Sequence, residues 1–130
     1  ICESSGSLCE IDDEETWETL FNNALLIYLE ASDTIKDEVI KRAQTHPKPL
    51  YYNHRFLLEK IAEFAQKNGL SGWQEIDPNA FAQWVFPHLI EHRVIRYEAL
   101  ANRYGITIPA ERLYGISGEK ALINLIKEYL

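Results

Sequence analysis

Apolar residues recur every three to four positions through most of this chain, which is the spacing of one face of an α-helix. The first such stripe runs from Trp17 to Tyr28 and predicts a helix that begins near Asp12. Residues 24–29 are apolar almost all round. We therefore expect this helix to lie at the centre of the fold.

Capping residues and prolines predict where the next two helices begin and end. The serine and aspartate at 32–33 can each cap a second helix, and Pro47 ends it because proline cannot continue the helical hydrogen bonds. A third helix is expected over residues 50–68. Its inner face is predicted to include His54 and Leu58.

A long helical pattern follows a strong start signal at Asp77-Pro78. Aspartate is a favourable N-cap, and proline fits the first helical turn. Pro87 is predicted either to kink this helix or to begin a new one. The pattern continues to Tyr104, and we expect Gly105 to end it because glycine commonly terminates helices.

The rest of the chain adds little that is not helical. Residues 106–108 read as a short extended piece, residues 110–114 as one helical turn, and Ser117 as the cap of a last helix. The sequence therefore predicts an all-α fold, an irregular bundle of five or six helices with short loops. Residues 1–11 are expected to form a flexible acidic leader before a single helical domain over residues 12–130.

The charge distribution indicates which classes of partner the chain can bind. The formal net charge is −7 at pH 7, and every charged side chain in residues 1–35 is acidic. Such an end repels a phosphate backbone and suits a basic partner, although acidic residues also favour a helix N-terminus. No apolar run approaches the roughly 18 residues that a membrane span needs, so no membrane partner is expected.

Methionine and cysteine usage bears on processing and location. The chain contains no methionine, so we expect an excised domain or a processed product, and a larger parent protein stays open. Cys2 and Cys9 are interpreted as two free thiols, with a small disulfide as the alternative. We expect a cytoplasmic location, and the absent initiator keeps a secreted or processed form as an alternative.

The most informative stretch runs from His88 through Glu91 to His92. Its H-x-x-E-H pattern resembles the motif of the inverted zinc hydrolases. On a helix, two imidazoles four residues apart can share one metal ion, with Glu91 as general base. Steps of 100° per residue place both histidines beside Ile95, on the face opposite the predicted core stripe. That arrangement suits a zinc site or an exposed helix face.

Two considerations weigh against catalysis at this motif. A catalytic zinc needs a third protein ligand and a cleft, and no downstream glutamate stands at a diagnostic spacing. The chain has four histidines, and so short a pattern arises readily by chance. We therefore expect no cofactor and no enzymatic activity. Zinc held by His88 and His92 is kept as an alternative.

Residues 97–114 carry a second motif, which resembles the first helix and turn of helix-turn-helix regulators. Gly105 would make the turn, and Arg96, Arg103 and Arg112 would contact DNA. The following segment is short for a recognition helix, and the chain lacks the basic footprint that DNA-binding domains show. DNA binding is therefore kept as an alternative, and nucleic acid is not expected as a partner.

Aromatic and outward-facing apolar residues point to another class of function. Tyr and Trp are over-represented at binding hot spots, and an isoleucine opposite a core stripe is either covered or part of an interface. The partner-binding candidates are Tyr51, Tyr52, Trp73, His88, His92 and Ile95. We predict a non-enzymatic protein-interaction or regulatory domain, of adaptor, inhibitor or effector type, that binds a protein partner or itself.

Overall fold

The computed structural model describes residues 1–4, 6–47 and 50–130. Its helices are α1 (Glu14–Phe21), α2 (Asp33–Thr45), α3 (His54–Lys67), α4 (Pro78–Tyr104) and α5 (Glu119–Tyr129). Its strands are β1 (Leu26–Glu30) and β2 (Gly105–Pro109), and its 3-10 turns are Leu8–Glu10, Trp73–Glu75 and Ala110–Leu113. The predicted mostly helical chain is confirmed. The all-α class needs correcting, because the two strands pair.

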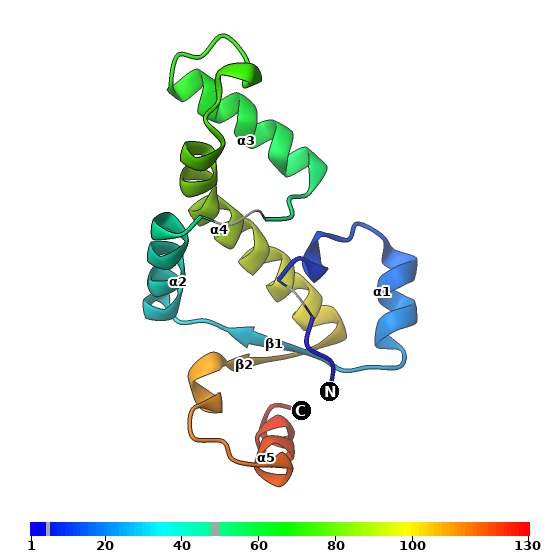
Figure 1. The fold of residues 1–130 in the computed structure, drawn as a ribbon. Helices are drawn as coiled ribbons and strands as arrows, with labels where there is room; N and C mark the ends of the chain where they lie inside the picture. The colour runs from blue at the N-terminus through cyan, green and yellow to red at the C-terminus, as the bar shows by residue number, and fades with distance from the viewer. Residues whose placement is uncertain (5, 48–49) are drawn as a thin grey trace.

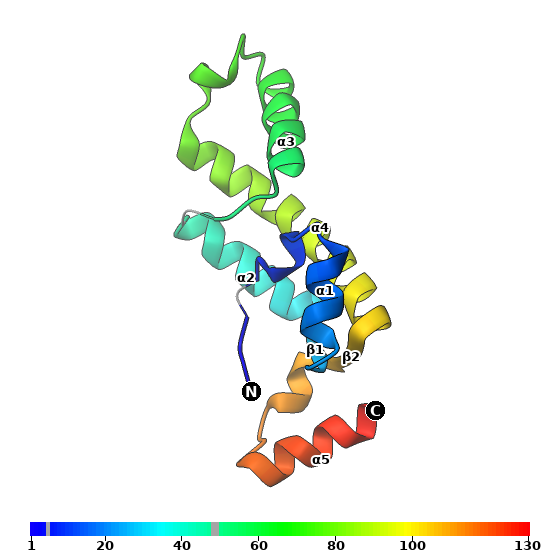
Figure 2. The ribbon, with the colours of Figure 1, turned by 90° about the vertical axis from the view of Figure 1, so that its right-hand side faces the viewer.

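Helix α4 is the spine of the molecule. It has 27 residues and contacts α2, α3, both strands and the Leu8–Glu10 turn. Helix α3 packs beside its first half, whereas α1 and the sheet lie at its second half (Figure 1). The view from the side shows α5 at the end opposite α3, below the sheet (Figure 2). Each end of α4 therefore meets a different set of neighbours.

Helix α4 starts where the sequence predicted. Its middle decides whether Pro87 lies within this helix or begins a new one. The side chain of Asp77 accepts a hydrogen bond of 2.7 Å from the Ala80 amide, and Pro78 is the first helical residue. Pro87 lies inside α4, so the prediction that it begins a new helix is wrong. The motif residues His88 to His92 consequently lie on one helix, as the zinc hypothesis requires.

The predicted first helix is too long. It ends at Phe21, and residues 26–30 form β1, which pairs in parallel with β2 from Leu26↔Gly105 to Glu30↔Pro109. Two asparagines follow α1, and asparagine is a poor helix former. The β-branched and aromatic residues of β1 favour a strand. The backbone of β2, almost 80 residues later, supplies the hydrogen bonds that the sequence pattern could not reveal.

Gly105 does more than end α4. A Cβ atom at this position would lie 1.9 Å from the backbone oxygen of Leu26. No other residue type could occupy it without pushing β1 and β2 apart. The glycine thus permits the chain to pass from helix directly into a paired strand.

The main core lies between α3 and the first half of α4. It consists of Phe56, Phe64, Phe81, Val85 and Leu89, and the last two have no exposed surface. Helix α3 therefore turns its phenylalanines inward. The prediction that His54 and Leu58 face the core is wrong, since His54 is exposed and Leu58 is 53% exposed.

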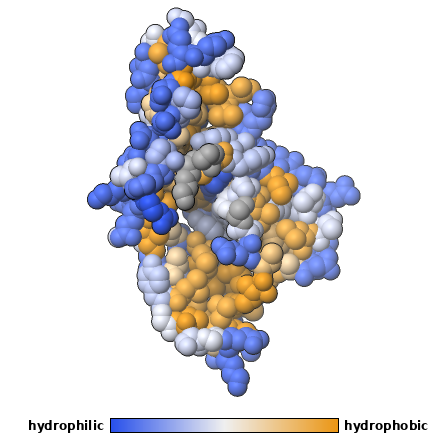
Figure 3. Space-filling view, in the orientation of Figure 1, coloured by the Kyte–Doolittle hydropathy of each residue, from blue (hydrophilic) through white to orange (hydrophobic). Residues whose placement is uncertain are grey.

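The sheet is less completely covered than this core. Helix α4 contacts both strands, and α5 contacts β2. On the face shown in Figure 3, apolar surface gathers over β1, β2 and the segment that leads to α5. Within the part of the chain that the structure describes, no helix is both long enough and apolar enough to cross a membrane.

Candidate functional site

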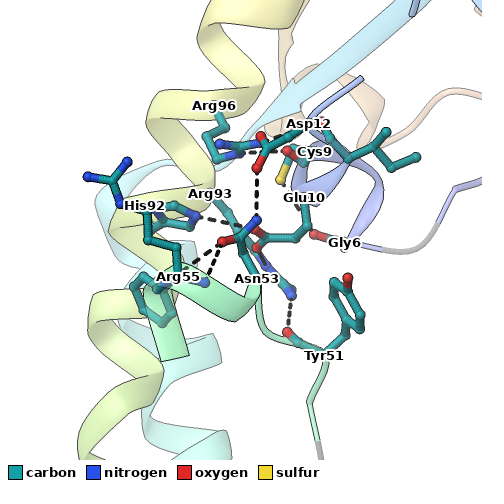
Figure 4. A network of polar contacts seen from close by, with 12 residues as sticks. Gly6, Cys9, Glu10, Asp12, Tyr51, Asn53, Arg55, His92, Arg93 and Arg96 are labelled. Atoms are coloured by element: carbon teal, nitrogen blue, oxygen red, sulfur yellow. Dashed lines mark hydrogen bonds and ion pairs between the residues drawn. The ribbon is translucent and has the colours of Figure 1, made fainter. Parts of the chain in front are cut away.

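An acidic N-terminal segment lies along the second half of α4. We call residues 8–18 the strap, and we call His92, Arg93, Arg96 and Arg103 of α4 the basic row. Contacts between the two join residues that are 82 to 89 positions apart in the sequence. Figure 4 shows the strap's carboxylates pointing at the guanidinium and imidazole groups of the helix.

Glu10 is the most buried charged group of this interface. Its side chain is 1% exposed, one carboxylate oxygen accepts a 2.9 Å hydrogen bond from Arg93 Nε, and the other lies 3.2 Å from His92 Nε2. A buried carboxylate is tolerated only when it is paired and hydrogen-bonded. The most deeply buried charge of the strap therefore lies directly on the basic row.

Arg93 and Asp12 extend the network to the start of α3. The Arg93 guanidinium also donates a 2.7 Å hydrogen bond to the carbonyl of Tyr51. Asn53, the N-cap of α3, donates a 3.0 Å hydrogen bond from its side-chain amide to Asp12. Three segments far apart in the sequence meet here, namely the strap, the approach to α3 and the middle of α4.

Arg96 holds the backbone of the strap as well as one of its side chains. Its Nε donates a 2.6 Å hydrogen bond to the Cys9 carbonyl, and its guanidinium pairs with Asp12. The hydrogen bond from Arg96 lowers the pKa of Asp12 below its ordinary value. The first helix was predicted to begin near Asp12. Asp13 caps it instead, which leaves Asp12 available for Arg96.

The end of the strap docks through charge and aromatic packing together. Arg103 pairs with Glu14 and lies 3.7 Å from Glu18. On the same helix α1, Trp17 is 7% exposed and stacks on Phe21 at 5.7 Å between ring centroids. Phe21 in turn stacks on Tyr104 at 5.3 Å. Helix α1 is thereby fixed to the last turn of α4.

Residues 8–10 depart from the predicted flexible leader. They form a 3-10 turn in which Cys9 and Glu10 are 1% and 4% exposed. The physical reason is the cationic side of α4, which gives the acidic segment partners that local sequence cannot show. A hollow of about 440 Å³ borders this turn. Its lining residues are Ser4, Ser7, Leu8, Glu10, Ile11 and Tyr51.

The two cysteines are free and lie in different environments. Cys2 is exposed, whereas Cys9 is buried within the strap interface. Burial, followed by the neighbouring Glu10 carboxylate, raises the pKa of the Cys9 thiol to about 11. A thiol with so high a pKa stays protonated near neutral pH and is a poor nucleophile. The arrangement supports packing at Cys9 rather than chemistry.

The H-x-x-E-H residues have separate surroundings. The His88 ring packs edge-on against Trp84 at 4.7 Å, whereas the His92 ring lies 4.6 Å from Phe56 and its Nε2 faces Glu10. Glu91 is exposed. Among the described residues, no three His, Cys, Asp or Glu side chains are grouped to hold a metal. Zinc binding by His88 and His92 stays a prediction.

The other predicted binding residues divide into two groups. Tyr51, Trp73 and Ile95 are 62%, 69% and 67% exposed, so their side chains are accessible to a partner. Tyr52 is half-buried and stacks on Phe56 at 6.4 Å, so it belongs mainly to the core. The three exposed residues belong to different segments: Tyr51 precedes α3, Trp73 begins a 3-10 turn and Ile95 lies on α4.

The segment predicted as a helix-turn-helix has another structure. After Gly105 the chain forms β2 and then the four-residue turn Ala110–Leu113, so a recognition helix does not follow α4. Arg96 and Arg103 pair with the strap. Arg112 lies 2.6 Å from Glu128 of α5. All three arginines proposed for DNA are thus paired with carboxylates.

Glu10, Asp12 and Arg93 are the interface residues that sequence reasoning missed. One signal was present: the cations at 93, 96 and 103 recur near helical spacing in the second half of the chain, and the acids gather before residue 19. Comparison with protein-family models, curated proteins and solved structures finds no match for this chain. The geometry of the molecule must therefore carry the functional argument.

Proposed function

We propose that this chain is a non-enzymatic protein-interaction module and that the outward stripe of α4 is its partner-binding surface. The outward stripe consists of Glu91, Ile95, Glu98 and Ala99, all of which are exposed. The observation that carries the proposal is Ile95, a large apolar side chain that is 67% exposed in the middle of the longest helix.

The geometry of α4 supports this choice of surface. Residues four apart lie on one side of a helix, so Glu91, Ile95 and Ala99 are aligned. One side of α4 packs against α3, and a neighbouring side carries the strap. The outward stripe takes part in neither contact. It is a rigid surface on which a partner can dock without rearranging the core.

The chemistry of the stripe suggests the kind of partner. Ile95 and Ala99 are apolar, and the carboxylates of Glu91 and Glu98 flank them. An apolar centre with a charged rim is typical of a protein interface. A polypeptide segment with one apolar anchor between lysines or arginines would complement it. A second copy of the chain is the other protein partner consistent with this surface.

Substitution Ile95→Glu tests the proposal. An exposed side chain contributes little to folding, so the free energy of unfolding should change by no more than about 0.5 kcal/mol in urea titrations. Leu58→Glu is the matched control, since Leu58 is 53% exposed on α3, away from the stripe. Loss of folding in Ile95→Glu alone would show that Ile95 is part of the core.

Photo-crosslinking provides the binding readout. A benzophenone amino acid placed at position 95 should give covalent adducts with a polypeptide in cells that express the chain. The same probe at position 58 should give fewer. Ile95→Glu should also weaken any self-association measured by analytical ultracentrifugation. Equal adduct yields at the two positions would contradict the proposed surface.

A further inference from the structure

The strap and the basic row form a binding pair that a second copy of the chain can complete. We propose that the strap of one molecule docks on the basic row of another, which gives a dimer with exchanged N-terminal segments. This inference does not depend on the proposed function, because Ile95 takes no part in the strap contacts. The partner it names is a second copy of this chain.

The contacts of the strap join residues that are far apart in the sequence. Glu10 binds His92 and Arg93, and Arg103 pairs with Glu14, across more than 80 residues. Such contacts do not require that both partners belong to one molecule. An exchanged dimer reproduces each of them with the same geometry, which is the basis of domain swapping.

We call the connection between α1 and β1 the hinge. The hinge consists of residues 22–25, all exposed. Among the described residues, its hydrogen bonds run back into α1: the Asn22 amide donates to the Glu18 carbonyl, and the Asn23 amide and side chain donate to the carbonyls of Leu20 and Thr19. Opening the hinge therefore breaks no hydrogen bond that the described residues make between it and the rest of the molecule.

Undocking the strap costs free energy. Removing Glu10 from its site leaves Arg93, whose side chain is 14% exposed, without its carboxylate. Undocking also uncovers Trp17, which is 7% exposed in the docked state. The loss of these charge-assisted hydrogen bonds and the exposure of aromatic surface both favour renewed docking. At high protein concentration, another copy offers the same site, so mass action populates the dimer.

Charge exchange at the buried pair tests the proposal directly. Glu10→Arg removes the carboxylate from the strap, and Arg93→Glu removes a cation from the basic row, so each variant repels its own strap. In a mixture, the strap of the Glu10→Arg variant can dock on the Arg93→Glu variant, where the new arginine faces the new glutamate. The strap of the Arg93→Glu variant, which keeps Glu10, can dock on the Glu10→Arg variant, which keeps Arg93. We expect the 1:1 mixture to form a heterodimer with twice the monomer mass by light scattering, and each variant alone to lack it.

The control uses an exposed pair that resembles the buried one. Arg55 and Glu59 form an i,i+4 ion pair on α3 with a 3.0 Å contact. A mixture of Arg55→Glu and Glu59→Arg should stay monomeric, because this pair holds no segment in place. A buried-pair mixture that stays at monomer mass would overturn the proposal.

A hinge deletion gives a second test that does not alter the interface. Removing Asn23 and Ala24 shortens the connection that must turn back in the closed monomer. We expect this variant to be dimeric over a wide concentration range, with its Cys9 thiol still protected from labelling. Deletion of Ser71 and Gly72 from the loop before the Trp73–Glu75 turn is the control and should leave the mass unchanged. A hinge-deleted chain that is a folded monomer with protected Cys9 would refute strap exchange.

Discussion

The two halves of α4 differ in how they bind the segments that cover them, α3 on the first half and the strap on the second. The first half packs Phe81, Val85 and Leu89 against the phenylalanines of α3. The second half carries the basic row, and its contacts with the strap are largely hydrogen bonds and ion pairs. One continuous helix thus joins an apolar core to a polar interface, and the two should respond differently to salt, pH and mutation.

The contrast implies that the two halves respond differently to substitution. Burial of apolar surface stabilises the folded chain by roughly 25 cal/mol per Å², whichever apolar side chains are in contact. Buried ion pairs contribute little net stability, yet removing one partner is costly because the other charge is left behind. The apolar half therefore fixes the fold. The ion pairs of the second half depend on which charge faces which, and the exposed ones weaken as salt rises.

The largest effect should come from the apolar half. Leu89→Ala removes a side chain with no exposed surface and leaves a cavity in the main core. We expect a loss of about 2–5 kcal/mol in the free energy of unfolding, measured by urea titration. The loss should be the same at low and high salt. Leu58→Ala, at a position 53% exposed, serves as the control and should have a much smaller effect.

The next effect should come from the buried carboxylate of the strap. Glu10→Gln keeps the shape of the side chain but removes the charge that pairs with Arg93 and His92. Charge-assisted hydrogen bonds contribute about 1.5–3 kcal/mol, so a loss in that range is expected. The amides of Ile11 and Trp17 bond to Leu8 and Asp13 within the strap, so their exchange should accelerate if the strap loses its local structure when it leaves α4.

Glu59→Gln controls for the loss of a carboxylate at the surface. Glu59 pairs with Arg55 on α3, and its side chain is 61% exposed. Its replacement should change neither the unfolding free energy nor the exchange of the strap amides appreciably. Equal effects of the two substitutions would remove the distinction between the polar half of α4 and an ordinary charged surface.

The smallest effect concerns pH. The hydrogen bond from Arg96 lowers the pKa of Asp12 in the folded chain below its unfolded value. The stability from this pair is therefore present above the unfolded pKa, about 3.9, and is lost as pH falls through the folded pKa. The Asp12 side chain is 64% exposed, so solvent screening limits its contribution to a few tenths of a kcal/mol.

Asp12→Asn isolates this contribution. The variant should be slightly less stable than the parent chain at pH 6, and the difference should shrink as pH falls below about 4 and vanish below the folded pKa of Asp12. Urea titrations at a series of pH values measure it. A difference that persists unchanged at pH 3 would mean that the Asp12 charge does not stabilise the strap.

Local signals in the sequence predicted several helix boundaries well. Ser32 accepts a hydrogen bond from the Ile35 amide and caps α2, and Asp77 caps α4, as their positions predicted. Capping works because the side chain and the amides that it satisfies lie within three residues of each other. The turn at residues 110–113 and the extended piece that became β2 were found for similar local reasons.

The candidate site was predicted only in part. Ile95 was placed on the outward face of α4 from helical geometry, and it is exposed. His92 was placed on the same face, yet the structure pairs it with Glu10. The helical wheel gives the direction of a side chain but not its neighbour. A neighbour 82 residues away depends on how the whole chain folds.

The sequence by itself determined that this chain is mostly helical, where several helices start, and that its charge is concentrated in an acidic N-terminal end. These properties depend on interactions within one or two helical turns. Only the tertiary structure decided that residues 26–30 are a strand, that the phenylalanines of α3 face inward, and that the strap covers α4. Each of these depends on partners far away in the chain, because the hydrogen bonds and buried contacts that select it form only when the chain has folded.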